Sequence, residues 1–171
     1  GDAAKQRYKL LGTDIEDVKK ELLEVNNLAL EGKPEDMVIT SHICRGNYHS
    51  TFFTSGPYDS VADYVFAKEN VDALFLEYDD ARSGGFAPLA KVSPDKKVVL
   101  GLITTKTPQL EEKEVVIRRI HEAAKYIPLD RLYLSPQCGF ASCEIGNKLT
   151  EEEQWAKLKL VKEIAEEVWG E

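Results

Sequence analysis

The chain has 171 residues, a formal net charge of −8 and 43% hydrophobic residues. This length is typical of one domain with its own core, so we expect residues 1–171 to form a single domain. The acidic charge argues against a nucleic-acid partner, and no apolar run approaches the ~20 residues that a membrane-spanning helix needs.

The first predicted element is a helix that begins near Thr13, because residues 13–16 have the pattern of a capping box. Apolar residues then recur every three or four positions as far as Ala29, and Gly32 followed by Pro34 predicts the end of the helix. Residues 1–10 show no such pattern, so we expect them to be loose or to be part of a neighbouring element.

Four apolar runs follow, each typical of a buried strand: residues 37–43, 73–76, 98–103 and 132–134. Amphipathic helices are predicted between and after them, over residues 60–68, over residues 111–126, and from a second capping box at Thr150. We expect the core to include the bulky aromatic side chains Phe52, Phe53, Trp155 and Trp169. The alternation of strands and helices predicts a parallel sheet with right-handed crossovers, either a barrel or a doubly wound sheet.

Three of these runs end in residues that can bind a metal: His42 and Cys44, Glu77, and Cys138. Side chains two positions apart in a strand point to the same face, and the C-terminal ends of parallel strands meet at one edge. Zinc takes tetrahedral sites made of thiolate, imidazole and carboxylate groups. Each residue taken alone is also explained as a small buried thiol, a hydrogen-bonded imidazole or a structural carboxylate.

The three cysteines are an odd number, and the first residues carry charge rather than the apolar segment of a secretion signal. We therefore expect no disulfide framework and a cytoplasmic location, where thiols stay reduced. Reduced thiols are free to bind a metal.

The neighbourhoods of these residues resemble the cobalamin-independent methionine synthase family. Residues 42–47, 75–80 and 135–142 read HICRGN, FLEYDD and SPQCGFAS, and they are most similar to the short, single-barrel members. The likeness extends from about Leu11 to the C-terminus. It implies a TIM-type barrel whose zinc is held by the histidine, the glutamate and the two cysteines named above.

An eight-stranded barrel needs about 250 residues, whereas this chain offers four strands. The expected fold is therefore α/β, the C-terminal half of a (β/α)8 TIM-type barrel, with four parallel βα units preceded by a helix. Half a barrel leaves unpaired strand edges and an uncovered inner face. We expect a homo-oligomer or association with the missing N-terminal half, and no turnover by this chain alone.

The resemblance implies a zinc-dependent methyltransferase that moves a methyl group to a thiol such as homocysteine, forming methionine. Its expected partners are that small-molecule thiol and a methyl donor. A carboxylate among thiolates is the ligand most easily displaced by a substrate thiol, which loses its proton on zinc. Two other functions stay open: a non-enzymatic module with a structural zinc, and an alkyl transferase acting on another thiol.

Polar residues beside the ligands have provisional roles. Arg45 could bind a substrate carboxylate with two hydrogen bonds, and Asp79 and Asp80 could orient a substrate amino group. Each is equally well explained as a loop or surface charge. Two-barrel members of the family place a proton-donating histidine in the loop matching residues 104–108, where this chain has Lys106 as the candidate donor. A folate as methyl donor is therefore in doubt.

Overall fold

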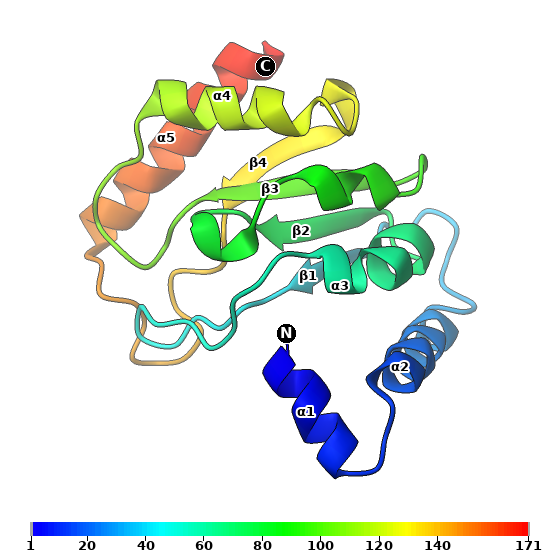
Figure 1. Ribbon diagram of the computed structural model, residues 1–171. Coiled ribbons are helices and arrows are strands. Elements are labelled where there is room, and N and C mark those ends of the chain that lie inside the picture. The colour runs from blue at the N-terminus through cyan, green and yellow to red at the C-terminus, as the bar shows by residue number, and fades with distance from the viewer. Residues whose placement is uncertain (1, 171) are drawn as a thin grey trace.

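The computed structural model describes residues 2–170, which form an α/β fold around one parallel sheet. Its strands are β1 (Thr40–Ile43), β2 (Ala73–Glu77), β3 (Lys97–Ile103) and β4 (Leu132–Pro136). They lie side by side in chain order and run in the same direction, so all four arrowheads point to the same side of the molecule (Figure 1). The predicted series of four parallel βα units is confirmed.

The α-helices are α1 (Asp2–Leu10), α2 (Ile15–Ala29), α3 (Asp59–Val61), α4 (Lys113–Ala123) and α5 (Glu151–Trp169). Helix α3 continues as a π-helical turn, η1 (Ala62–Phe66), and short 3-10 turns are η2 (Ala81–Ser83), η3 (Ala87–Lys91) and η4 (Leu129–Arg131). Helix α1 was not expected from the sequence. Among residues 2–170, no helix combines the length and the apolar character needed to cross a membrane.

The two predicted capping boxes have different outcomes. At α5, the Thr150 hydroxyl accepts the Glu153 N–H and the Glu153 carboxylate accepts the Thr150 N–H, as predicted. At α2 the prediction of Thr13 as the cap is wrong, because the Asp14 carboxylate accepts the Glu16 N–H at 2.9 Å. An aspartate is as good a helix cap as a threonine.

Strand β1 is shorter than the predicted run over residues 37–43. Met37 and Val38 lie before it and are 47% and 74% exposed. The N–H of Ile39 bonds to the carboxylate of Asp72 instead of to a neighbouring strand. The prediction of a strand buried on both faces is wrong here because β1 lies at the edge of the sheet.

The hydrophobic core lies on one face of the sheet. On this face, strand side chains pack against side chains from η1, η3, α4 and α5. The core includes Leu74, Leu76, Leu100, Leu102, Phe66, Leu89, Val116, Ile120, Leu160 and Ile164. The opposite face carries the cross-strand row His42, Phe75, Val99 and Tyr133. Tyr133 is 41% exposed there. The sheet therefore has one packed face and one open face.

Three of the four aromatic residues expected in the core are exposed, and only Trp169 packs against it. Trp155 is 59% exposed, and Phe52 and Phe53 are 53% and 90% exposed. Helix α5 instead buries Lys157, whose ammonium group donates to the carbonyl of Gln109 at 2.6 Å. The long apolar stem of lysine can cover core surface while its charged end finds a partner.

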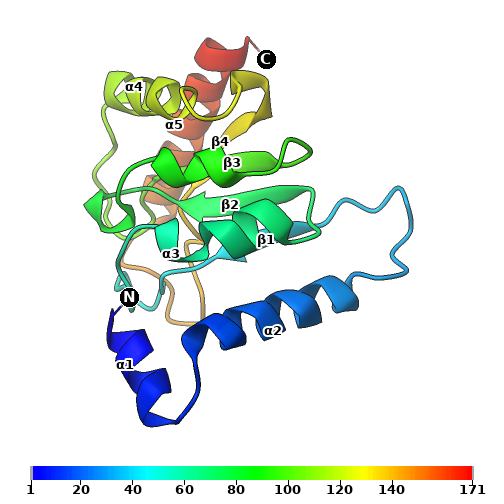
Figure 2. The same cartoon turned by 45° about the vertical axis from the view of Figure 1, so that its right-hand side comes forward.

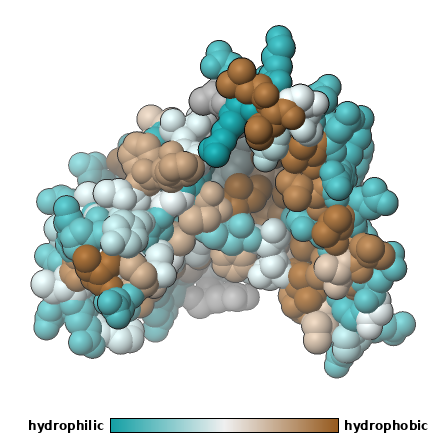
Figure 3. Space-filling model, turned by 90° about the horizontal axis from the view of Figure 1, so that it is seen from below, coloured by the Kyte–Doolittle hydropathy of each residue, from teal (hydrophilic) through white to brown (hydrophobic). Residues whose placement is uncertain are grey.

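Helix α2 lies apart from the sheet. It runs below the sheet and α3 (Figure 2), and the side chain of Asn27 joins it to residues 68 and 70 after η1. Its apolar residues Leu22, Val25 and Leu28 are 56%, 55% and 61% exposed. Figure 3 shows hydrophobic side chains gathered along this helix beside a hollow. Such a surface is typical of a place where another protein segment packs.

Gly101 in β3 provides a test of the sheet packing. A Cβ added there would lie 2.7 Å from Gln137 Cα and 2.8 Å from the Leu76 carbonyl oxygen. We expect Gly101→Ala to lower the free energy of unfolding by about 1–3 kcal/mol, the usual cost of overpacking, in urea denaturation. Gly85→Ala is the control, because its Cβ would meet nothing within 4 Å. Equal stability of the two variants would contradict this packing.

Candidate metal centre

Four side chains that can bind a metal converge at the C-terminal edge of the sheet. They come from β1 and the residues after it, from the end of β2, and from the loop after β4, and are His42, Cys44, Glu77 and Cys138. One ligand atom from each lies within 4.8 Å of the ligand atoms of the other three. The fold thus gathers the histidine, the glutamate and both cysteines of the sequence motifs at one point.

The imidazole of His42 is oriented by two contacts. Its Nδ1 lies 3.2 Å from the carbonyl oxygen of Phe75, and its Nε2 lies 3.6 Å from Glu77 Oε1. A carbonyl oxygen only accepts hydrogen bonds, so Nδ1 carries the proton in this contact and Nε2 faces the cluster. Metal-binding histidines are commonly held in this way by a carbonyl behind the ring.

Glu77 is completely buried. Its Oε1 accepts the N–H of Arg45 at 3.0 Å, while its Oε2 has no hydrogen-bond partner. Leaving a buried polar atom unpaired costs about 1–3 kcal/mol, and a bound cation would remove that cost. The unpaired oxygen, together with a donor set of two sulfurs and one imidazole, fits zinc.

The main chain of Glu77 is fixed by the hydroxyl of Tyr58. That oxygen accepts the Glu77 N–H at 2.9 Å and donates to the Glu77 carbonyl at 3.2 Å. Tyr58 lies in an aromatic cluster, with its ring centroid 5.6 Å from that of Phe66 and 5.2 Å from that of Tyr78. The buried core behind the sheet therefore holds the carboxylate in place.

In the cluster, the imidazole and the acidic groups each favour the charged form of the other. Cys138, and then Glu77, raise the pKa of His42 to about 10. His42 in turn lowers the pKa of the Cys138 thiol. Burial of Glu77 pushes its pKa up, but the contact with His42, the hydrogen bond from the Arg45 N–H and the charge of Lys106 together keep that pKa below its ordinary value. A metal ion would replace the imidazolium proton that balances these negative groups.

A cavity of about 380 Å³ opens beside the cluster on the uncovered side of the sheet. His42, Phe75, Ser135 and Cys138 are among the residues that line it. The volume is in the range of small-molecule sites. Two of the four possible metal ligands therefore face a space that could admit a small molecule.

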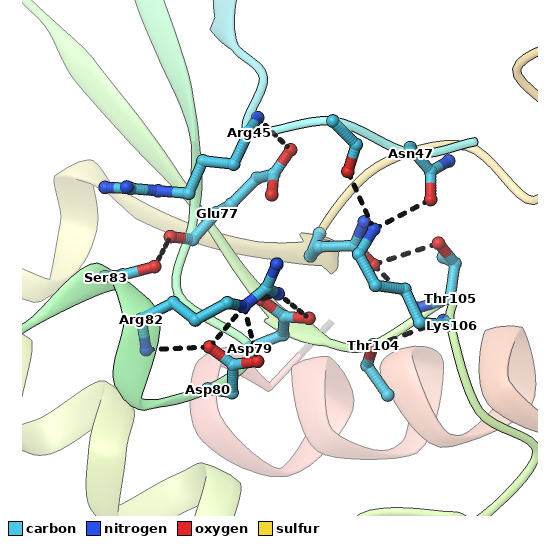
Figure 4. A network of polar contacts seen from close by, with 12 residues as sticks. Arg45, Asn47, Glu77, Asp79, Asp80, Arg82, Ser83, Thr104, Thr105 and Lys106 are labelled. Atoms are coloured by element: carbon cyan, nitrogen blue, oxygen red, sulfur yellow. Dashed lines mark hydrogen bonds and ion pairs between the residues drawn. The ribbon is translucent and has the colours of Figure 1, made fainter. Parts of the chain in front are cut away.

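Sequence reasoning assigned no role to Asn47, although it lies only three residues after Cys44 of the His-x-Cys motif. Its side chain is 5% exposed, and its Oδ1 accepts from Lys106 Nζ at 2.8 Å. Its Nδ2 donates to the Gly139 carbonyl at 2.6 Å and to Ser142 Oγ at 3.0 Å. Figure 4 shows Asn47 beside Lys106. Asn47 thus joins the loops after β1, β3 and β4.

Asn147, a second residue that the sequence did not reveal, extends this network. Its Nδ2 donates to Asn47 Oδ1 at 2.9 Å and to the Thr105 carbonyl at 2.8 Å. The backbone N–H of Thr105 donates to Gln137 Oε1 at 2.6 Å. The loops around the cluster are therefore fixed by side-chain amides.

The structure turns the guanidinium group of Arg45 away from Glu77 (Figure 4). Its Cζ lies 4.2 Å from the centre of the Tyr58 ring. Asp79 and Asp80 are both held by Arg82, which donates from Nη2 to Asp79 at 3.1 Å and from Nε to Asp80 at 2.6 Å. Asp79 and Asp80 are thus paired with Arg82, and Arg45 stacks on Tyr58 instead of facing the Glu77 carboxylate.

Comparison with known proteins identifies the family. The family model described as "Cobalamin-independent synthase, Catalytic domain" matches residues 19–167. The uncharacterized protein YxjH of Bacillus subtilis is 52% identical over 169 residues, which cover 98% of this chain and 45% of YxjH. The 5-methyltetrahydropteroyltriglutamate–homocysteine methyltransferase of Bacillus licheniformis is 25% identical over 98% of this chain and 20% of that enzyme.

A solved structure shows the same fold. The putative vitamin-B12-independent methionine synthase of Listeria monocytogenes has a TM-score of 0.69 and 42% sequence identity, over 90% of this chain and 42% of that chain. The four-stranded parallel sheet is thus consistent with part of a TIM barrel. The chain spans less than half the length of YxjH and of the Listeria protein. By the family model and these matches, the chain belongs to the cobalamin-independent methionine synthase family.

Proposed function

We propose that this chain carries the zinc-binding half of a methyltransferase that transfers a methyl group to a thiol such as homocysteine, forming methionine. The observation that carries the proposal is the convergence of one imidazole, one carboxylate and two thiols within 4.8 Å. Family membership and the homocysteine methyltransferase of Bacillus licheniformis support it. The activity belongs to a protein in which the rest of the barrel is also present.

His42, Cys44, Glu77 and Cys138 would hold the metal. Bound zinc would supply the acidity that converts a substrate thiol to a thiolate at neutral pH. Glu77 would supply the one hard-oxygen donor among the four ligands, and the N–H of Arg45 holds its carboxylate in position. The substrate sulfur then bonds to the methyl carbon as the bond from that carbon to the donor breaks. The donor leaves with the electron pair and takes up a proton.

The other residues singled out in the sequence stay predictions. Arg45, Asp79 and Asp80 are predicted to contact the substrate, and Lys106 is predicted to donate the proton to the leaving group. Lys106 Nζ already donates two hydrogen bonds, to the Gly46 carbonyl at 3.1 Å and to Asn47 at 2.8 Å. One N–H of the ammonium group is left for such a role.

We further propose that the open face of the sheet and the apolar face of α2 are covered by the missing half of the barrel or by a second copy of the chain. Leu22, Val25 and Leu28 are each more than half exposed, and β1 and β4 are both edge strands. Free cysteines at the cluster favour a reducing cytoplasm as the place of action.

A structural zinc is the second candidate function, because all four donors come from the protein and such sites normally brace a fold. An alkyl transfer to a thiol other than homocysteine is the third. Removal of the metal distinguishes a structural zinc from the two functions in which the zinc binds a substrate thiol.

We expect chelation of zinc to leave the fold intact and to abolish binding of homocysteine. The core lies on the face of the sheet away from the open side, and the hydrogen bonds of Asn47 join the loops independently of the four ligand side chains. Circular dichroism with thermal melting measures the fold, and isothermal titration calorimetry measures homocysteine binding. Loss of cooperative melting on chelation would favour a structural zinc. Undiminished homocysteine binding without zinc would contradict the proposed methyltransferase.

A further inference from the structure

We propose that Lys106 is a positioning residue that fixes the two cysteines of the candidate metal centre, acting through Gly46 and Asn47. The inference rests on the proposed zinc site. It assigns to Lys106 a role in the assembly of the site that is separate from proton donation.

Lys106 is buried, and its ammonium group forms no ion pair among residues 2–170. The residue is 8% exposed, and no carboxylate in the described part of the chain lies within 4.0 Å of its ammonium group. Its hydrogen bonds go instead to two neutral oxygens, those of Gly46 and Asn47. Burial of a charge without an ion pair is costly. We therefore expect the two groups that Lys106 holds, the Gly46 carbonyl and the Asn47 amide, to have a role in the site.

The first of these contacts leads to Cys44. Gly46 is held on both sides, because its carbonyl accepts from Lys106 at 3.1 Å and its N–H donates to Cys44 Sγ at 3.3 Å. Its φ of 101° requires glycine, and an added Cβ would lie 2.5 Å from the backbone nitrogen of Phe53. This turn therefore has little freedom, and fixing its carbonyl also fixes the direction of the N–H toward the sulfur.

The second contact leads to Cys138. Lys106 and Asn147 both donate to Asn47 Oδ1, which orients the amide so that its Nδ2 donates to the carbonyl of Gly139. Gly139 directly follows Cys138. The lysine thus connects the loop that carries one cysteine to the loop that carries the other.

The charge of Lys106 also suits a loaded site. Two thiolates and one carboxylate carry three negative charges, one more than a divalent cation neutralises. A nearby ammonium group balances that remaining charge. Burial lowers the pKa of Lys106, and the negative charges of Glu77 and Cys138 oppose that shift.

The test is the zinc affinity of purified variants of this chain, measured by competition with a chromophoric chelator. We expect Lys106→Met and Lys106→Gln to bind zinc about tenfold more weakly, the scale on which outer-shell partners act. Lys106→Arg, which keeps the charge and several donors, should recover most of the loss. With cobalt in place of zinc, the thiolate-to-metal absorption of Lys106→Met should differ from that of the wild type.

Lys157→Met is the matched control. Lys157 is also buried, and it donates to Gln109 and Glu111, neither of which belongs to the cluster. Its loss should lower stability and leave zinc affinity unchanged.

Wild-type zinc affinity in folded Lys106→Met would overturn the inference and leave the proposed function standing. Lys106→Gln decides in the same way if Lys106→Met does not fold, because it keeps an N–H donor on a shorter chain. If the wild-type chain binds no zinc, both the inference and the proposed function fail.

Discussion

Cys138→Ser is expected to abolish stoichiometric zinc binding. The substitution removes one of the two sulfur donors within 4.8 Å of the other ligand atoms, and a serine hydroxyl is not among the usual ligands of zinc. Loss of a direct ligand should weaken binding by more than about 100-fold, the upper limit for outer-shell partners. His42→Ala should have the same effect. The measurement is the metal content of dialysed protein by atomic emission.

The chain offers matched controls for both substitutions. Cys143 is an exposed thiol only five positions from Cys138, and His121 is an exposed histidine of α4. Neither belongs to the cluster, so Cys143→Ser and His121→Ala should keep a full equivalent of zinc. A loss of zinc in Cys143→Ser together with full zinc in Cys138→Ser would show that the ligand set is wrong.

Phe66→Ala is expected to cause the largest loss of stability among these variants. Phe66 in η1 is completely buried and packs against Tyr58, whose hydroxyl holds the main chain of Glu77. Truncation of a buried phenylalanine costs about 3–5 kcal/mol, a large part of the about 5–15 kcal/mol that stabilises a typical domain. Urea denaturation followed by circular dichroism measures the change.

Phe53→Ala is the control for this prediction, because Phe53 is 90% exposed. Its loss should change the free energy of unfolding by less than about 0.5 kcal/mol, as is usual for surface positions. Equal losses in Phe66→Ala and Phe53→Ala would contradict the described core and its support of Glu77.

Strands β2 and β3 could be predicted from the sequence because continuous apolar runs are typical of strands packed between layers. The same rule overestimated β1, since residues 37–39 are apolar but lie outside the sheet. Periodicity shows which residues are apolar and says nothing about what covers them. Periodicity thus did not predict that Trp155, Leu22 and Val25 are exposed. The chain spans less than half the length of YxjH, so the part that could cover them is not in it.

The candidate ligands could be found from the sequence because each lies at or just after the end of an apolar run. The supporting network could not be found in this way. Asn47 and Asn147 are joined by a hydrogen bond although they lie 100 positions apart in the sequence. Because asparagine is common in ordinary loops, neither residue stands out in the sequence. The π-helical turn η1 has no recognisable sequence pattern either. Such contacts become visible only once the loops are placed together.

The most direct test of the central claim is the X-ray absorption spectrum, at the zinc edge, of the chain loaded with one equivalent of zinc. If His42, Cys44, Glu77 and Cys138 surround one ion, the spectrum will show two sulfur atoms at about 2.3 Å and two nitrogen or oxygen atoms at about 2.0–2.2 Å. A first shell without sulfur, or with a single sulfur atom, would contradict the assignment of these four residues as the metal site.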